Sequence, residues 1–183
     1  MIGSIISILI IMLEFFKRNR IFFLSILLSI TLIIIDQITK SAAITNVNNL
    51  MHKTNGIHEY FNILPFLNIV LVFNRGISFG IFNSSSFMPT LLLFVILFII
   101  LYAFYMLCKS NSIYRSMYLG MILGGAIGNV IDRFRYGAVV DFIDFHILNW
   151  HFPAFNFADA VISLSVIFII VEEFMLLDKK ADK

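Results

Sequence analysis

The sequence predicts an α-helical integral membrane protein with four transmembrane helices and a small β-rich loop between the first and the second. Of its 183 residues, 60% are hydrophobic and 13% are charged, and the mean hydropathy is +0.96. A soluble domain is nearer to half apolar and a quarter charged. Four segments also approach the roughly 20 apolar residues that a membrane-spanning helix needs, and they lack the alternation of β-barrel strands.

The predicted membrane domain covers residues 21–177. Its transmembrane helices are expected at about residues 21–43, 87–108, 113–131 and 157–177. Residues 1–20 form an apolar and then basic extension, which is unlike a signal peptide because its positive charges follow the apolar part. We interpret it as an interfacial anchor or as the product of a start placed too far upstream. Residues 178–183 form a short basic tail.

The basic residues predict the orientation in the membrane. They flank the start of the first helix, the link between the second and third, and the end of the fourth: Lys17, Arg18, Arg20, Lys109, Arg115, Lys179, Lys180 and Lys183. Because lysine and arginine collect on the cytoplasmic side, both termini should be cytoplasmic. The loops 44–86 and 132–156 then face outward.

The outer loop 44–86 changes character along its length. It begins with the polar TNVNNLMHKTNGIHEY and continues with the β-branched and aromatic ILPFLNIVLVFNRGISFGIFN. Pro65, Gly76 and Gly80 interrupt the second part, which is typical of a short sheet or hairpin. We expect this hairpin to lie on the membrane surface.

Composition disfavours several classes of site. The net charge of +2 is too small to indicate a nucleic-acid partner. A single cysteine, Cys108, leaves no internal disulfide framework and no cysteine-rich metal site. His146 and His151 are more typical of loop or interface histidines than of metal ligands. Carboxylates with water could hold Mg²⁺ or Ca²⁺, but their spacing does not require it, so we predict no metal and no cofactor.

Five of the eleven acids are expected at the outer ends of the helices or in the segment that joins the third and fourth. They are Asp36, Asp132, Asp141, Asp144 and Asp159. Acids at membrane depth usually face a bundle interior or a cavity and mark a functional site. The sequence therefore predicts a cluster of carboxylates at the outer rim.

The third helix carries a stripe of small residues at Gly120, Gly124 and Gly128, which allows a neighbouring helix to approach closely. Asn129, Asp132 and Arg133 follow, and spacings of three and four place Asn129 beside the other two. This group is either a hydrogen-bonded helix end, with Arg133 reaching toward the headgroups, or part of a functional site.

The segment GAVVDFIDF, residues 137–145, predicts a turn and an extended piece in which Asp141 has β-branched and aromatic neighbours. After Pro153, Asn156 is a good N-cap for the fourth helix and places Asp159 at the third helical position. Asp159 is thus either a capping-box residue or a reactive carboxylate. Two carboxylates about 3 Å apart share one proton, so Asp141 and Asp159 could together hydrolyse a peptide with water alone.

Four stretches form a series of motifs: DQITK at 36–40, NRGISFG at 74–80, GGAIGNVIDRFRYGAVVDFIDF at 124–145 and FPAFNFADAVI at 152–162. Together they resemble the lipoprotein signal peptidase family, also called signal peptidase II. The resemblance implies a bacterial inner-membrane aspartic endopeptidase with four transmembrane helices, a periplasmic β-rich cradle and a periplasmic active site. It also implies cleavage of diacylglyceryl-modified prolipoproteins just before the lipidated cysteine.

Residue by residue, the resemblance assigns the catalytic pair to Asp141 and Asp159. It assigns supporting or substrate-binding roles to Asp36, Lys40, Asn74, Gly76, Asn129, Asp132, Arg133 and Asn156. Arg75 and Ser78 depart from the residues common in the family, which bears on substrate fit. We expect the chain to act as a monomer with prolipoprotein substrates and membrane lipids as partners, and we expect EDTA to leave its activity intact.

The outer loop 44–86 is expected to close over the bound substrate, and Phe79 and Phe82 either anchor in the membrane or contact the substrate lipid.

A proton- or cation-coupled transporter would also use intramembrane acids, but those acids should be spread through the bilayer. Here the middles of the second and fourth helices lack ionisable residues. A non-catalytic assembly factor would explain the glycine stripe and leave the acids without a purpose.

Overall fold

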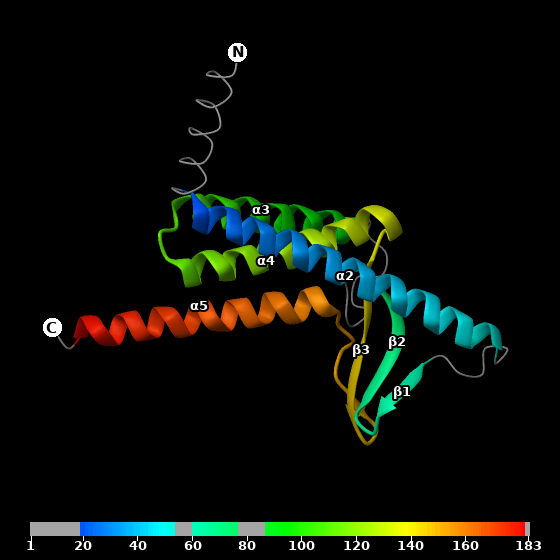
Figure 1. Cartoon of the computed structure of the whole chain (residues 1–183). Coiled ribbons are helices and arrows are strands. Elements are labelled where there is room, and N and C mark those ends of the chain that lie inside the picture. Colours follow the sequence, from blue (N-terminus) through cyan, green and yellow to red (C-terminus); the bar gives the residue numbers. More distant parts are fainter. Residues whose placement is uncertain (1–18, 54–59, 77–86, 182–183) are drawn as a thin grey trace, which may run out of the picture.

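The computed structural model describes residues 19–53, 60–76 and 87–181. Within these ranges, four long helices pack alongside one another and a sheet projects from one end of them (Figure 1). The helices are α2 (Arg20–Lys53), α3 (Phe87–Lys109), α4 (Ile113–Tyr136) and α5 (Phe157–Ala181). Residues 1–18 of the predicted extension 1–20 lie outside the described residues, as do Ser78, Phe79 and Phe82.

The helices alternate in direction. In Figure 1, α2 and α4 run toward the sheet, whereas α3 and α5 run away from it. Arg20, Lys109 and Arg115 therefore lie at the end of the bundle opposite the sheet. This arrangement agrees with the predicted grouping of the basic residues.

Helix α4 packs against the three other helices, and its glycines permit the close approach that was predicted. A methyl group on Gly120 would lie 2.6 Å from the carbonyl oxygen of Ser25, and one on Gly124 would lie 2.8 Å from that of Ser29. Both serines belong to α2, so the stripe is used for packing within the chain.

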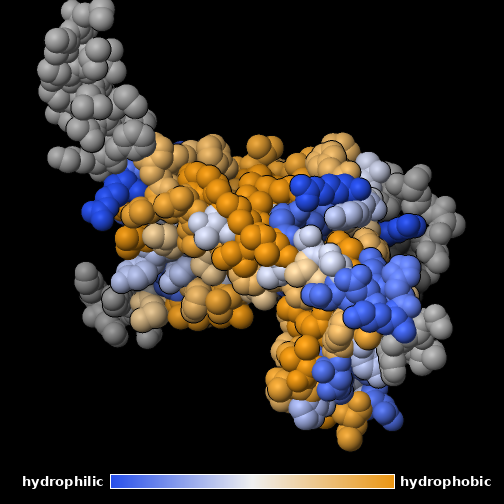
Figure 2. Space-filling model, turned by 45° about the vertical axis from the view of Figure 1, so that its right-hand side comes forward, coloured by the Kyte–Doolittle hydropathy of each residue, from blue (hydrophilic) through white to orange (hydrophobic). Residues whose placement is uncertain are grey.

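Two described helices, α2 and α3, are long and apolar enough to cross a membrane by their length and composition. Their outward side chains are large and apolar, as in Leu27, Phe94 and Leu101, which are 60%, 66% and 69% exposed. Figure 2 shows this apolar surface along the helices. Helix α4 has a glycine-rich buried face and α5 carries Glu172 and Glu173, so a bundle of four transmembrane helices stays a prediction.

Three helices end later than predicted. Helix α2 continues to Lys53, so residues 44–53 are helical and do not belong to the outer loop. The polar residues there have low helix propensity, but Val47 is fully buried at 0% exposure, and its packing holds these turns. Helix α4 ends at Tyr136 because Gly137 adopts a left-handed φ of 67° and its amide bonds to the Arg133 carbonyl.

Helix α5 likewise extends to Ala181, so most of the predicted tail 178–183 is helical.

The sheet is antiparallel with the strand order β1 (Phe61–Leu64), β2 (Leu67–Asn74), β3 (Val139–Ile147) and β4 (Trp150–His151). The predicted hairpin in the outer loop and the extended segment after Gly137 are thus confirmed.

The sheet also places the start of α5 beside β3. The amide of Phe155 donates to the carbonyl of Ile143 at 3.1 Å, and the amide of Ile143 donates back at 2.8 Å. Asp141 lies on β3 opposite Val72 of β2. Strand β3 therefore lies between β2 and the first turn of α5.

Candidate active site

The first turn of α5 is capped by a reciprocal pair of hydrogen bonds. The side-chain oxygen of Asn156 accepts from the amide of Asp159 at 2.9 Å, and Oδ2 of Asp159 accepts from the amide of Asn156 at 3.3 Å. This is the predicted capping box. It fixes both side chains and leaves Nδ2 of Asn156 and Oδ1 of Asp159 directed at other elements.

Asp141 is buried on β3 and is held by two asparagines. Asn156 Nδ2 donates to Asp141 Oδ1 at 2.8 Å, and Asn74 Nδ2 donates to Oδ2 at 2.9 Å. Burial and the negative charge of Asp159 raise the pKa of Asp141 to about 6, although both hydrogen bonds and the charge of Lys40 oppose the rise. Asp159 is thus close enough to Asp141 for the two charges to interact.

The orientation of Asn74 is set by the turn that follows it. The amide of Gly76 donates to Asn74 Oδ1 at 2.8 Å, so the NH₂ end of the side chain faces Asp141. Gly76 has a φ of +97°, and any side chain on it would also meet Leu92. Glycine is therefore required here for the turn that aims Asn74.

Asn129 of α4 links the two acidic residues. Its Nδ2 donates to Asp159 Oδ1 at 2.8 Å, and its Oδ1 accepts from Lys40 Nζ at 2.9 Å and from Asn156 Nδ2 at 3.3 Å. An amide has one donor end and one acceptor end, so the two donors from Lys40 and Asn156 determine which end of Asn129 faces Asp159. The chain of contacts runs from Asp141 through Asn156 and Asn129 to Asp159.

A buried ion network lies next to this chain. Lys40 Nζ is 2.8 Å from Asp36 Oδ2 and 2.7 Å from Asp132 Oδ2. The residues Asp36, Lys40 and Asp132 are 0%, 2% and 1% exposed. Asp36 also accepts from the amide of Ala158, and Asp132 from that of Val140, both at 3.1 Å. The network therefore fastens α2 and α4 to the start of α5 and to β3.

Sequence reasoning did not single out Gln37, although it lies inside DQITK. Its Nε2 donates to Asp132 Oδ1 at 2.9 Å, and its Oε1 accepts from Arg135 Nη1 at 3.0 Å. The signal that could have found it is its place beside Asp36 in that motif. Gln37 adds a neutral donor to a network that holds two carboxylates and one ammonium group.

Arg133 makes a helix-end contact, and its role in the functional site stays a prediction. Its Nη1 donates to the Asn129 carbonyl at 3.3 Å, as expected at a helix end. Its guanidinium also interacts electrostatically with Asp159 and Asp141. Arg133 therefore borders the candidate site.

Asp144 does not join the cluster of the other four acids. Asn68 Nδ2 donates to it at 3.0 Å, and His151 Nδ1 lies 2.9 Å from both of its carboxylate oxygens. Burial raises the pKa of Asp144, but the hydrogen bonds from Asn68 and His151 outweigh burial and hold that pKa below its ordinary value. His151 thus has a structural partner on the sheet.

In the part of the chain that the structure describes, no group of three or more His, Cys, Asp or Glu side chains is arranged to hold a metal ion. The carboxylates are instead partnered by lysine, asparagine, glutamine and backbone amides. Asp141 and Asp159 come from different elements and are joined through neutral amides. Such a pair can hold one proton and exchange it with a water molecule and a peptide.

The chain is similar in sequence to one family of known proteins over most of its length. The family described as "Signal peptidase (SPase) II" matches residues 28–175. The "Lipoprotein signal peptidase" of Rickettsia prowazekii (strain Madrid E) is 40% identical over 149 residues, which are 79% of this chain and 72% of that protein. The "Lipoprotein signal peptidase" of Polynucleobacter necessarius subsp. necessarius (strain STIR1) is 41% identical over 145 residues, which are 78% of this chain and 84% of that protein.

A solved structure is also similar. It is titled "Bacterial membrane enzyme structure by the in meso method at 2.3 A resolution". It matches with a TM-score of 0.64 and 33% identity, and the match covers 87% of this chain and 90% of that one. The likeness thus extends over nearly the whole chain.

Proposed function

The chain belongs to the signal peptidase II family, and on this premise we propose that Asp141 and Asp159 are its catalytic pair. The protein is a bacterial membrane aspartic endopeptidase that removes signal peptides from prolipoproteins. The observation that carries the proposed pair is the hydrogen-bond chain from Asp141 through Asn156 and Asn129 to Asp159. It holds two carboxylates from β3 and α5 in one site.

The pair works with a single proton between its members. The ionised carboxylate takes a proton from water while the water oxygen attacks the scissile carbonyl carbon. The protonated partner gives its proton to the carbonyl oxygen, and a tetrahedral diol forms. When the C–N bond breaks, the amine leaves with the proton that came from water. A diol proton then returns to the second carboxyl, so the pair again holds one proton.

We assign the resting proton to Asp141. Burial and the charge of Asp159 raise its pKa to about 6, so Asp141 keeps its proton to a higher pH than an ordinary aspartate does. The two protons of such a pair leave in coupled steps, so a measured pKa belongs to the pair as a unit.

The surrounding residues position this pair. Asn74, Gly76, Asn129 and Asn156 orient the two carboxylates, and Asp36, Lys40 and Asp132 fasten the elements that carry them. Arg133 interacts electrostatically with both members of the pair, and this supports the proposal that it contributes to the substrate-binding site. No step of this mechanism needs a metal or a cofactor.

We further propose that all four described helices cross the inner membrane with both termini in the cytoplasm. The alternating helix directions and the common end of Arg20, Lys109 and Arg115 support this topology (Figure 1). The pair then lies on the periplasmic side, where the scissile bond of a signal peptide emerges. The substrate would be a diacylglyceryl-modified prolipoprotein cut before its lipidated cysteine, bound by a monomer with its lipid still in the bilayer.

Cleavage of a diacylglyceryl-modified prolipoprotein by the purified protein in detergent tests the pair. Asp141→Asn and Asp159→Asn should each lower kcat by about 10²- to 10⁴-fold, which is the usual contribution of one acid–base group. Asp144→Asn is the matched control because Asp144 is a buried acid on the same strand that stands outside the pair. It should stay within about tenfold of wild type. If either of the first two variants is folded and cleaves at a near-normal rate, that aspartate is structural.

A further inference from the structure

The two carboxylates of the buried ion network each hold the backbone amide that comes directly before a member of the proposed catalytic pair. Asp132 Oδ2 accepts from the amide of Val140, which precedes the aspartate on β3, at 3.1 Å. Asp36 Oδ1 accepts from the amide of Ala158, which precedes the aspartate on α5, at 3.1 Å. The places of these two carboxylates therefore set the places of both catalytic residues through the backbone.

Gln37 bridges the same two carboxylates. Its Nε2 donates to Asp132 Oδ1 at 2.9 Å and to Asp36 Oδ2 at 3.3 Å. Two carboxylates repel each other, and the single ammonium group of Lys40 balances one of their two charges. The amide of Gln37 adds donors to both carboxylates without adding a charge. Lys40 and Gln37 thus hold Asp36 and Asp132 together.

Arg135 determines which way the amide of Gln37 points. Its Nη1 donates to Gln37 Oε1 at 3.0 Å, and a guanidinium can only donate, so the amide oxygen must face it. The NH₂ end then faces the carboxylates and the carbonyl of Gly128, which accepts at 3.3 Å. Gly128, Asp132 and Arg135 are spaced by four and three residues, so they share one face of α4. The guanidinium supplies the second positive charge, one amide away from the network.

We propose that Gln37, oriented by Arg135, is a positioning residue for the catalytic pair. It fixes the separation of Asp36 and Asp132, and the two amides that these carboxylates hold pass that separation on to the pair. The hydrogen bonds of Gln37 within the described residues reach neither member of the pair, so it acts through other residues. The inference rests on the proposed function, because it concerns the geometry of the same two aspartates.

Two substitutions of Gln37 test this role. Gln37→Glu has the same shape and keeps an oxygen toward Arg135, but it turns a second oxygen toward both carboxylates. Gln37→Met removes the donors and adds no charge. Gln37→Glu should lower kcat by about 10- to 100-fold, which is the scale of a misplacement of about 1 Å, and Gln37→Met should lower it less. KM should stay unchanged in both, because neither change touches the substrate.

Hydrogen–deuterium exchange of the full chain in detergent tests the geometry without a cleavage assay. Gln37→Met should speed exchange in the peptides that contain Val140 and Ala158, whose amides bond to the two carboxylates. Arg135→Met should do the same to a smaller extent and should lower kcat several-fold. Because Arg135 is exposed, this variant keeps the test possible if a change at the half-buried Gln37 prevents folding.

The pH profile of cleavage separates positioning from a structural role. The hydrogen bonds from Asn74 and Asn156 lower the pKa of Asp141, and a displaced Asp141 makes them less well. Gln37→Met should therefore move the midpoint of the decline in cleavage to higher pH. A Gln37 that only stabilised the fold would lower Tm and leave this midpoint, and kcat per folded enzyme, where they are in the wild type.

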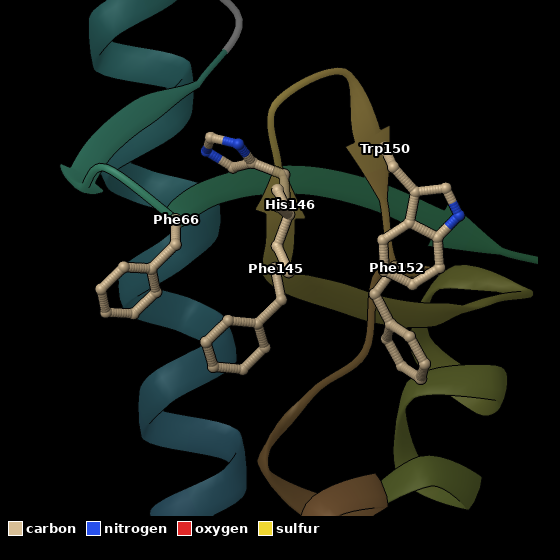
Figure 3. Close-up of a pocket in the computed structure, with 6 residues that line it drawn as sticks. Phe66, Phe145, His146, Trp150 and Phe152 are labelled. Carbon is tan, nitrogen blue, oxygen red and sulfur yellow. The ribbon is translucent and has the colours of Figure 1, made fainter.

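Two control variants change polar side chains that do not bridge the network. Thr39→Val lies in the same motif as Gln37, and the Thr39 hydroxyl bonds to the Asp36 carbonyl within its own helix at 2.9 Å. Asn68→Ala removes a 3.0 Å bond from an amide to the buried carboxylate of Asp144. This bond lies in the outer region of the sheet that Figure 3 shows, one residue from Phe145. Both controls should keep kcat and the pH midpoint of the wild type.

The outcomes distinguish this inference from the proposed function. If Asp141→Asn and Asp159→Asn abolish cleavage while both Gln37 variants cleave at the wild-type rate, with unchanged exchange at Val140 and Ala158, Gln37 does not position the pair. If folded Asp141→Asn or Asp159→Asn cleaves normally, the proposed function fails. The exchange measurement then still decides whether Gln37 holds the two amides.

Discussion

Lys40→Met should be among the most damaging single substitutions in this protein. The ammonium group of Lys40 lies within 2.9 Å of Asp36, Asp132 and Asn129, and the residue is only 2% exposed. Its removal leaves two buried carboxylates without their counter-ion. Breaking a buried ion pair by removing one partner costs about 3 to 5 kcal/mol. For a chain of this size the loss corresponds to a drop of about 6 to 20 °C in Tm.

The same substitution should also impair the enzyme that remains folded. Without Lys40, only the 3.3 Å hydrogen bond from Asn156 Nδ2 still holds the amide of Asn129 with its NH₂ end toward Asp159, and a flipped amide would present an oxygen to the carboxylate. The charge of Lys40 also opposes the raised pKa of Asp141, so its removal should move the pH profile of cleavage to higher pH. A purely structural role for Lys40 would lower the amount of active enzyme and leave that profile in place.

Thermal unfolding in detergent and the pH profile of cleavage measure both effects. Lys109→Met is the matched control, because Lys109 is an exposed lysine whose ammonium lies 4.6 Å from the ring of Tyr105, and it should cost no more than about 1 kcal/mol. The double variant Lys40→Met/Asp132→Asn should lose less stability than the sum of its single variants, by about 0.5 to 3 kcal/mol. The network reasoning is refuted if Lys40→Met unfolds within a few degrees of wild type and keeps its pH profile.

Three further predictions follow from the geometry. Cleavage should decline above a pH of about 6 as Asp141 loses its proton. Asn74→Ala should move the midpoint of this decline to higher pH, because the hydrogen bond from Asn74 lowers the pKa of Asp141. An unmoved midpoint would contradict the assignment of the proton to Asp141. Folding raises the pKa of Asp141 from 3.8 to about 6. The contribution of Asp141 to stability is therefore present below pH 3.8 and is lost as the pH rises through about 6. Melting temperatures of the wild type that do not fall across this window would contradict the raised pKa. Gly124→Ala should destabilise the protein by about 1 to 3 kcal/mol in thermal unfolding, because the new methyl group would lie 2.8 Å from the Ser29 carbonyl oxygen. Alanine normally stabilises a helix interior relative to glycine. A raised Tm would therefore show that α2 and α4 are not so close.

Features set by neighbouring residues could be predicted from the sequence. The capping box joins Asn156 to a residue three positions later, and the glycine stripe repeats every four residues, so helical spacing alone determines both. The strand that holds Asp141 was likewise visible from its β-branched and aromatic neighbours. In each case the relevant partner lies within one or two turns of the chain.

The end of α2 and the connections of the site could not be predicted in this way. Helix α2 extends to Lys53 because Val47 is buried by tertiary packing, and no local signal reports that packing. The contacts of Lys40 with Asn129 and Asp132 join α2 to α4, and the contact of Asn74 with Asp141 joins β2 to β3. Spacing says nothing about pairs so distant in the chain, so only the resemblance to a family brought these residues together.

These long-range contacts explain why the site has so many polar residues for a two-carboxylate reaction. Asp141 and Asp159 repel each other when both are ionised, so the fold must hold them together against that repulsion. Asn156 and Asn129 do so with neutral donors, which orient the carboxylates without cancelling the charge that the chemistry needs. The only buried cation of the cluster, among the residues that the structure describes, sits one step away on Lys40, where Asp36 and Asp132 share it. The arrangement thus separates the group that stabilises the fold from the proposed catalytic pair.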